Sequence, residues 1–248
     1  MSRWRASGIH LCISALVAAL VLGTLYLLWY PSSYFTAMGG EKLLYLLVGV
    51  DVAIGPLITA IIFRSDKKGL TFDLAFIGFM QAAALTYGVS IAAEARPVYT
   101  VFVVDRFEVV PANALDPDEL AKVQREEFKS LSWTGPRVVG VVKPADPGEQ
   151  YRILLATLQG LDLQHFPQHY VPYENLAAQA GRRAQPLAAL RRYNSERAHE
   201  IDDLLRRNGL NEADVGFLPL RARRGERAVI VRRTGEIVAT LDLSPWGD

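Results

Sequence analysis

Cysteine and unbalanced charge are both nearly absent from this chain of 248 residues. The single cysteine, Cys12, lies inside a long apolar run, so no intramolecular disulfide can form and the rest of the chain carries no thiol. Positive and negative charges are almost equal, with 27 Lys and Arg residues against 26 Asp and Glu residues. This balance gives no electrostatic reason to expect a nucleic acid as a partner.

The motifs of common enzyme classes are also missing. The sequence has no phosphate-binding glycine loop, no dinucleotide fingerprint and no Gly-x-Ser-x-Gly elbow. His165 and His169 are four residues apart with Glu174 beyond them, which on a helix would suggest zinc. Pro167 and Pro172 make a regular helix there unfavourable. We therefore expect no enzyme, no cofactor and no metal site.

Long apolar runs are the main feature that the chain does have. Residues 8–30 contain no Asp, Glu, Lys or Arg, and a helix of this length reaches about 34 Å, enough to cross a bilayer. Runs at 43–63 and 72–93 are also long enough. The sequence therefore predicts a transmembrane domain at 1–96, with three helices at about 8–30, 43–63 and 72–93, followed by a soluble domain at 97–248.

A signal peptide is the alternative interpretation of the first run. Arg3 and Arg5 resemble the basic start of such a peptide. Its apolar core would cover only about 7–15 residues, however, and the run here is longer. We therefore favour a retained membrane span.

Basic residues flank the three runs unevenly, which predicts an orientation. Five lie on one side and two on the other: Arg3, Arg5, Arg64, Lys67 and Lys68 against Lys42 and Arg96. By the positive-inside rule the N-terminus is cytoplasmic. Three crossings then place the soluble domain outside, in the periplasm of a Gram-negative host, with the spans in the bacterial inner membrane.

Two polar side chains fall inside the predicted spans, Asp51 in the second and Gln81 in the third. A carboxylate near the middle of a bilayer is costly unless it is protonated, paired or in contact with water. Both residues lie near the middle of neighbouring antiparallel helices, so they can meet at one depth and form a hydrogen bond. Three roles stay open: a bond between two helices, a docking site for a partner helix, or a path for protons or ions.

Three further residues of the second run are candidates for partner binding. Gly49 belongs to a row of small residues of the kind that lets helices approach closely in lipid. Pro56 follows Gly55 and opens a backbone carbonyl that another group can use. With the two polar side chains, these residues form the predicted site.

The region after residue 96 has the pattern of an α+β domain with an antiparallel sheet. Asp116 and Asp146 each precede a proline, which is the arrangement of a helix N-cap and first helical position. The predicted helices are 117–130, 147–160 and 173–208, the last with a break at 185–186. The predicted strands are 98–105, 106–110, 137–143, 215–220, 226–233 and 236–243, of which the last three form an antiparallel meander.

Several tracts occur together in an order that resembles a known family. They are SRWRASGIHL at 2–11, GVDVAIGPL at 49–57, FDL at 72–74, ARPVY at 95–99, VVDRF at 103–107 and WTGP at 133–136. These tracts resemble the TfpX/TfpZ family of type IV pilin accessory proteins, and the C-terminal part matches less distinctively.

The resemblance implies an inner-membrane chaperone or assembly modulator that binds type IV major pilin before pilus assembly and has no enzymatic activity. Such a pilin has one hydrophobic membrane helix with a buried glutamate and a periplasmic head. Gln81 would then donate to that carboxylate, and Asp51 would share a proton with it. Membrane lipid and other pilus assembly proteins are further expected partners. The alternative is a membrane-anchored periplasmic sensor or regulatory protein, although the cytoplasmic side leaves no output domain.

Overall fold

The computed structural model describes residues 2–31, 33–64 and 68–246. Lys67, which entered the orientation argument, lies outside these residues. The chain divides into two compact units: a helical unit with residues up to 35 and 39–95, and a soluble unit with residues 36–38 and 96 onward. Each is described by itself.

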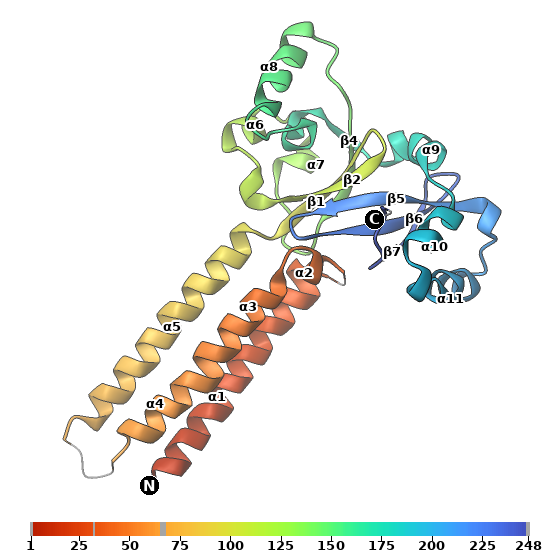
Figure 1. Ribbon diagram of the computed structural model, residues 1–248. Helices are drawn as coiled ribbons and strands as arrows, with labels where there is room; N and C mark the ends of the chain where they lie inside the picture. The colour runs from red at the N-terminus through yellow and green to blue at the C-terminus, as the bar shows by residue number, and fades with distance from the viewer. Residues whose placement is uncertain (1, 32, 65–67, 247–248) are drawn as a thin grey trace. The chain divides into compact units, whose positions relative to one another are not determined.

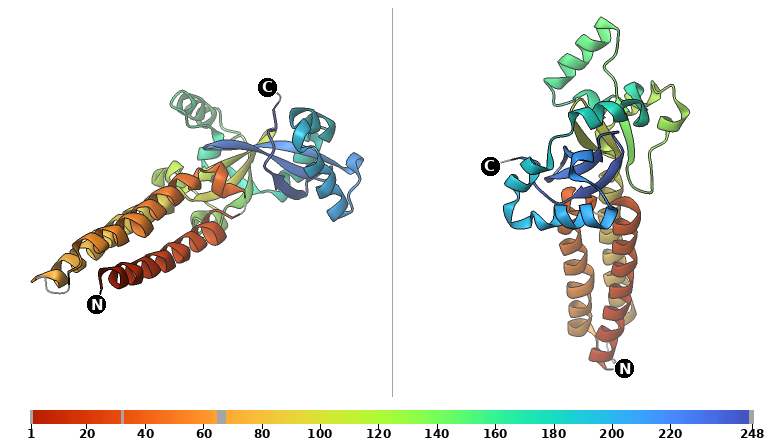
Figure 2. Two further views of the ribbon diagram at one scale, coloured as in Figure 1. Left: turned by 60° about the horizontal axis from the view of Figure 1, so that its bottom comes forward. Right: turned by 90° about the vertical axis from the view of Figure 1, so that its right-hand side faces the viewer.

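The helical unit consists of three long helical stretches that alternate in direction (Figure 1, Figure 2). The first is α1, Arg3–Thr24, extended by the π-helical segment η1, Leu25–Trp29. The short helix α2, Tyr34–Ala37, lies between this stretch and the next. The second stretch has three parts: α3, Gly40–Leu47, the π-helical η2, Val48–Ile54, and α4, Gly55–Ile62. The third is α5, Leu70–Glu94.

Two of these stretches, Arg3–Trp29 and Leu70–Glu94, are long and apolar enough to cross a membrane. The predicted second span, 43–63, does not reach the same standard, because its apolar helix is the shorter Gly49–Ile62. A π-helical segment commonly marks a functional site in a helix, and Pro56 directly after it cannot donate a backbone hydrogen bond.

The described residues of the soluble unit form a seven-stranded sheet with the order β4-β3-β1-β2-β5-β6-β7. The strands are β1, Pro97–Val103; β2, Arg106–Pro111; β3, Arg137–Val141; β4, Tyr170–Pro172; β5, Val215–Ala222; β6, Gly225–Arg232; and β7, Ile237–Leu241. The meander of the last three strands is antiparallel, as predicted.

The prediction of an antiparallel sheet is wrong for two neighbouring pairs, so the sheet is mixed. β1 pairs with β3 in parallel, and β2 pairs with β5 in parallel. In both cases helices lie between the paired strands in the chain, and such excursions return the backbone to the same end of the sheet. β4 is only three residues long and was not predicted.

The soluble unit has six α-helices among its described residues beyond residue 96. They are α6, Pro117–Ala121; α7, Glu126–Lys129; α8, Pro147–Thr157; α9, Glu174–Arg183; α10, Leu187–Tyr193; and α11, His199–Asn208. Asp116 and Asp146 are N-caps as predicted, and their carboxylates accept from the backbone N–H groups of Asp118 and Glu149 at 2.8 and 2.7 Å. The predicted helix 117–130 is instead two short helices, and 173–208 holds three.

Two clusters of buried apolar side chains stabilise the soluble unit. In one, Tyr99 of β1 packs edge-to-face against Tyr170, with ring centroids 5.0 Å apart, and against Phe128 at 6.4 Å. In the other, Leu190 and Ile201 of the helices pack with residues of β5 and β6. Burial of these side chains is the main favourable contribution to folding of this unit.

Candidate functional site

The structure brings Asp51 of η2 and Gln81 of α5 together, with the Gln81 amide against the Asp51 backbone and close to its carboxyl group. The Nε2 atom of Gln81 donates to the backbone carbonyl of Asp51 at 3.2 Å. If the Gln81 amide were turned over, its Oε1 would face the Asp51 carbonyl oxygen, and neither atom can donate. The nitrogen end of the Gln81 amide therefore faces Asp51.

Pro56 and Gly55 explain why the Gln81 amide can bond there. In a π-helical register the donor to the Asp51 carbonyl would come from position 56, and proline has no N–H. Gly55 leaves the necessary space, because a Cβ atom at this position would lie only 2.0 Å from Gln81 Nε2. The missing donor and the missing side chain together create a place for the amide.

His10 of α1 joins the same cluster and was not predicted to do so. Its Nε2 lies 2.7 Å from Gln81 Oε1, and its Nδ1 lies 2.7 Å from Thr59 Oγ1 of α4. The Gln81 oxygen can only accept, so Nε2 carries the proton in this bond. In the neutral ring, Nδ1 then accepts from the Thr59 hydroxyl. The chain of hydrogen bonds therefore runs from Thr59 through His10 and Gln81 to Asp51.

Ser7 adds a second connection between α1 and α4. Its hydroxyl donates to the Pro56 carbonyl at 2.8 Å. Ser7 and His10 are three residues apart and therefore share one helix face. Two polar residues on one face of the first helix are the sequence signal that predicts such a contact. We call His10, Asp51, Thr59 and Gln81 the polar cluster.

The carboxyl group of Asp51 is the open member of the polar cluster. Asp51 is only 7% exposed, and its Oδ1 has no hydrogen-bond partner within the described part of the chain. A buried polar atom of this kind is costly, and such an exception needs an explanation. Gln81 uses its oxygen and one of its two amide donors inside the unit, and its amide lies close to the Asp51 carboxyl. Asp51 Oδ1 is therefore the buried acceptor of this site that a further donor can reach.

Gly49 has a different environment from Gly55. A Cβ atom at Gly49 would meet nothing within 4 Å among the atoms that the structure describes. The residue therefore makes no close helix contact within this unit.

Helix α5 also has a hollow of about 570 Å³ along one face, lined by Phe79, Ala82, Ala83, Thr86, Tyr87 and Ser90. Phe79 is 65% exposed and Tyr87 is 69% exposed. The hydroxyls of Thr86 and Ser90 donate to carbonyls of their own helix at 2.7 and 2.8 Å. The hollow is therefore apolar in character, with small residues between two aromatic side chains.

The two histidines considered for zinc bind other groups. His165 Nδ1 accepts from the backbone N–H of Asp162 at 3.1 Å. His169 Nε2 lies 2.9 Å from Glu149 Oε1. Within residues 2–31, 33–64 and 68–246 no cluster of three or more His, Cys, Asp or Glu residues is arranged to hold a metal ion.

Comparison with known proteins gives a consistent result. Residues 1–39 match the family described as fimbrial assembly protein FimB. Over 246 residues the chain is 31% identical to the fimbrial assembly protein of serogroup I from Dichelobacter nodosus, covering 98% of this chain and 95% of that protein. It is 30% identical, with the same coverage, to the protein of serogroup E1 from that organism. No solved structure matches significantly. The narrower TfpX/TfpZ assignment stays a prediction, but similarity over almost the whole of both chains shows that this protein belongs to the fimbrial assembly protein family.

Proposed function

We propose that this protein is an accessory factor of type IV pilus assembly that resides in the bacterial inner membrane and binds major pilin before pilus assembly, as a chaperone or assembly modulator. The family relationship supports a role in pilus assembly. Two helices long and apolar enough to cross a bilayer support anchoring in a membrane. The observation that carries the binding proposal is the buried and incompletely bonded Asp51.

We propose that the second helical stretch also crosses the membrane, which brings the number of spans to three. The backbone is helical from residue 40 to residue 62. The Thr59 hydroxyl of this stretch bonds to His10, and its Asp51 backbone carbonyl accepts from Gln81; these two partners lie on the two longer helices. Hydrogen bonds between helices in lipid favour such an arrangement. With three spans and a cytoplasmic N-terminus, the soluble unit lies in the periplasm.

The proposed partner group is the glutamate in the membrane helix of pilin. A protonated carboxyl of that residue would donate to Asp51 Oδ1, or Asp51 would donate in the opposite direction; in low dielectric the two acids must share a proton to avoid repulsion. Ile54, three residues after Asp51 on the same stretch, is about half exposed and offers an apolar contact for the pilin helix. This modifies the role expected for Gln81, whose amide positions the Asp51 backbone rather than contacting pilin directly.

Photocrosslinking in the membrane tests the proposal without removing Asp51. A photoreactive residue at position 54, which is half exposed and three residues from Asp51, should form an adduct with pilin, and Asp51→Asn should lower its yield at least tenfold. Gly49→Ala is the matched control, since the added methyl group meets open space. Unchanged yield in a normally expressed Asp51→Asn variant would show that Asp51 does not bind pilin.

A fusion reporter tests the orientation separately. A periplasm-active reporter at the C-terminus should be active, and a cytoplasm-active reporter at the same place should be inactive. The opposite pattern would disprove the proposed topology. A C-terminus on the same side as the cytoplasmic N-terminus requires an even number of crossings, whereas the proposal has three.

A further inference from the structure

Helix α8 of the soluble unit has its apolar and polar sides reversed. Four apolar side chains recur at the i, i+3, i+4 and i+7 positions and face solvent, the last of them at the C-cap of the helix. They are Tyr151, Leu154, Leu155 and Leu158, which are 63, 61, 45 and 82% exposed. We call these four residues the α8 stripe. A surface helix normally turns such a stripe toward the core and its charged residues toward water.

The charged side of α8 is held against the domain by a network of ion pairs. Arg152 donates to both carboxylate oxygens of Glu119, at 2.8 and 3.0 Å, and also to Glu149 at 2.7 Å. Gln168 donates to Glu119 at 2.6 Å, and His169 Nε2 lies 2.9 Å from Glu149. These bonds fix the rotation of the helix about its axis. The outward direction of the α8 stripe is therefore built into the fold.

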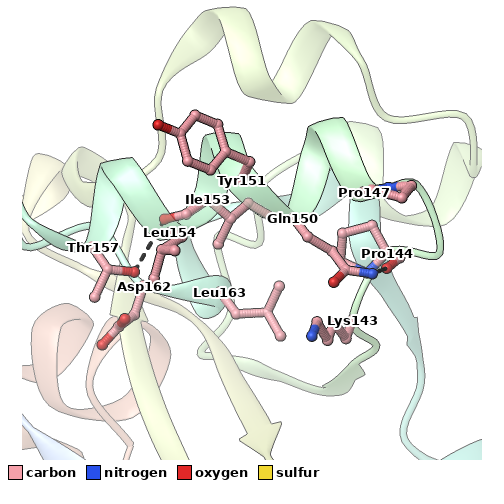
Figure 3. Close-up of a pocket in the computed structure, with 10 residues that line it drawn as sticks. All are labelled: Lys143, Pro144, Pro147, Gln150, Tyr151, Ile153, Leu154, Thr157, Asp162 and Leu163. Atoms are coloured by element: carbon pink, nitrogen blue, oxygen red, sulfur yellow. Dashed lines mark hydrogen bonds between the residues drawn. The ribbon is translucent and has the colours of Figure 1, made fainter.

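A hollow of about 500 Å³ adjoins the α8 stripe and shares Tyr151 and Leu154 with it. Figure 3 shows Leu163 across from Ile153 and Gln150 of α8. The Gln150 amide donates to the Pro144 carbonyl at 2.8 Å. Ile153 and Leu163 give the hollow apolar walls, so it has both the size and the lining to accept a large apolar side chain.

The properties of the α8 stripe favour one kind of occupant. Interfacial membrane helices carry many Lys and Arg residues on their polar face, whereas α8 has one arginine, which is paired with two glutamates. A stable homodimer needs about 800 Å² from each partner, and four partly exposed side chains supply only a few hundred Å². Four anchors on one helix face are typical of recognition between a helix and an apolar groove or helix of another protein.

We propose that the α8 stripe and the adjoining hollow bind the apolar face of a helix in the exported part of pilin. The choice of pilin rests on the proposed function, whereas the requirement for an uncharged apolar helix rests on the surface itself. Leu154 and Leu158 act as central anchors, and the hollow accepts one large side chain of the partner.

Crosslinking with purified components tests this surface. The full chain in phosphatidylcholine nanodiscs carries a photoreactive residue at position 158, or at Arg206 of the exposed α11 as the matched control. With purified pilin, the yield at 158 should exceed that at 206 at least tenfold. Leu154→Gln combined with Leu155→Gln should reduce the yield at 158 at least tenfold. The thermal unfolding midpoint should not fall, because both side chains are exposed.

The possible outcomes separate the two proposals. Equal yields at 158 and 206, or adducts at 158 with lipid or with a second copy of the chain, would overturn the proposed surface. A probe at position 54 in the same nanodiscs reports on the intramembrane contact. Pilin adducts at 54 without adducts at 158 would refute the α8 surface alone. Adducts at 158 without adducts at 54 would support the surface and refute pilin binding within the membrane.

Discussion

The helical unit and the soluble unit expose different kinds of side chain. In the helical unit, His10 bonds to Thr59 and to Gln81 between the helices, while Leu20 and Phe79 are more than 60% exposed. In the soluble unit, side chains such as Phe217 and Ile230 are fully buried, and most charged residues lie at the surface. The difference is the one expected for lipid and water as the two solvents.

Helix α8 departs from this rule within the soluble unit. Its charged residues face inward and its leucines face outward, as in a helix of the other unit. In water this arrangement leaves apolar area unburied, and exposed apolar patches commonly mark sites of interaction. The comparison therefore identifies α8 as the part of the soluble unit whose surface is completed by a partner.

The largest effect is expected from shortening a core side chain of the soluble unit. Phe217→Ala should lower the free energy of unfolding by about 3–5 kcal/mol, because it leaves a cavity at a fully buried site. Phe79→Ala, on the exposed face of α5, should change the stability of the helical unit by much less. Urea unfolding followed by limited proteolysis of the full chain in detergent would measure both. Equal losses in the free energy of unfolding for the two substitutions would contradict the difference between the units.

Acid should loosen the inward side of α8. The Arg152 guanidinium lowers the pKa of Glu149 from 4.5 to about 2, with a further contribution from His169. Because the folded pKa is lowered, the stabilisation is complete above pH 4.5 and is lost as the pH falls toward 2. Allowing for water around Arg152, we expect a loss of about 1–2 kcal/mol.

Thermal unfolding between pH 3 and pH 7 measures this dependence. Glu149→Gln should be less stable at pH 7 and less sensitive to acid than the unaltered chain. Glu126, which is exposed and pairs with Lys129 on α7, offers Glu126→Gln as a control that should keep the original profile. If Glu149→Gln kept that profile as well, the ion pairs would not be what holds α8.

Filling the space beside the Gln81 amide should weaken the helical unit. Gly55→Ala places a methyl group where Gln81 Nε2 now lies, so the amide must leave its bonds with His10 and Asp51. Interhelical hydrogen bonds in lipid contribute about 0.6 kcal/mol each, so a loss of about 1 kcal/mol is expected. Denaturation in mixed detergent micelles would measure it. Alanine has a higher helix propensity than glycine at both positions, so Gly49→Ala should stabilise the unit, and the loss in Gly55→Ala is measured relative to it. An equal effect of both substitutions would contradict the assigned role of Gly55.

The smallest effect is expected at Ser7, which lies beside the polar cluster. Ser7→Ala removes the bond from its hydroxyl to the Pro56 carbonyl. The loss of about 0.6 kcal/mol is partly offset by the higher helix propensity of alanine, so the net change should be a few tenths of a kcal/mol. The same denaturation assay applies. A change in the free energy of unfolding above about 1 kcal/mol would show that Ser7 contributes as much as the members of the polar cluster.

Features set by neighbouring residues could be predicted well. The Asp-Pro pairs at 116–117 and 146–147 begin helices, and the turn at 233–236 closes the last hairpin of the meander. The long apolar runs at the N-terminus and at 72–93 are helices of membrane-spanning length. Each signal depends on residues a few positions apart, and the backbone responds to it locally.

The candidate site was predictable only in part. Asp51, Gln81, Gly55 and Pro56 were identifiable because polar, glycine and proline residues stand out in an apolar run. That His10 completes the bonding of Gln81 was not, since residues 10 and 81 are brought together only by packing of the helices. The register of each helix decides whether the Gln81 amide meets a side chain or a backbone carbonyl.

By itself the sequence determined the division of the chain into apolar runs long enough to cross lipid and patterned segments suited to water, along with the local starts and ends of helices. Only the tertiary structure decided the parallel strand pairs, the convergence of His10 with Gln81 and the outward direction of the α8 stripe. The physical reason is distance along the chain. Hydrophobic pattern and capping act over a few residues, whereas strand order and helix rotation depend on contacts between residues far apart in sequence.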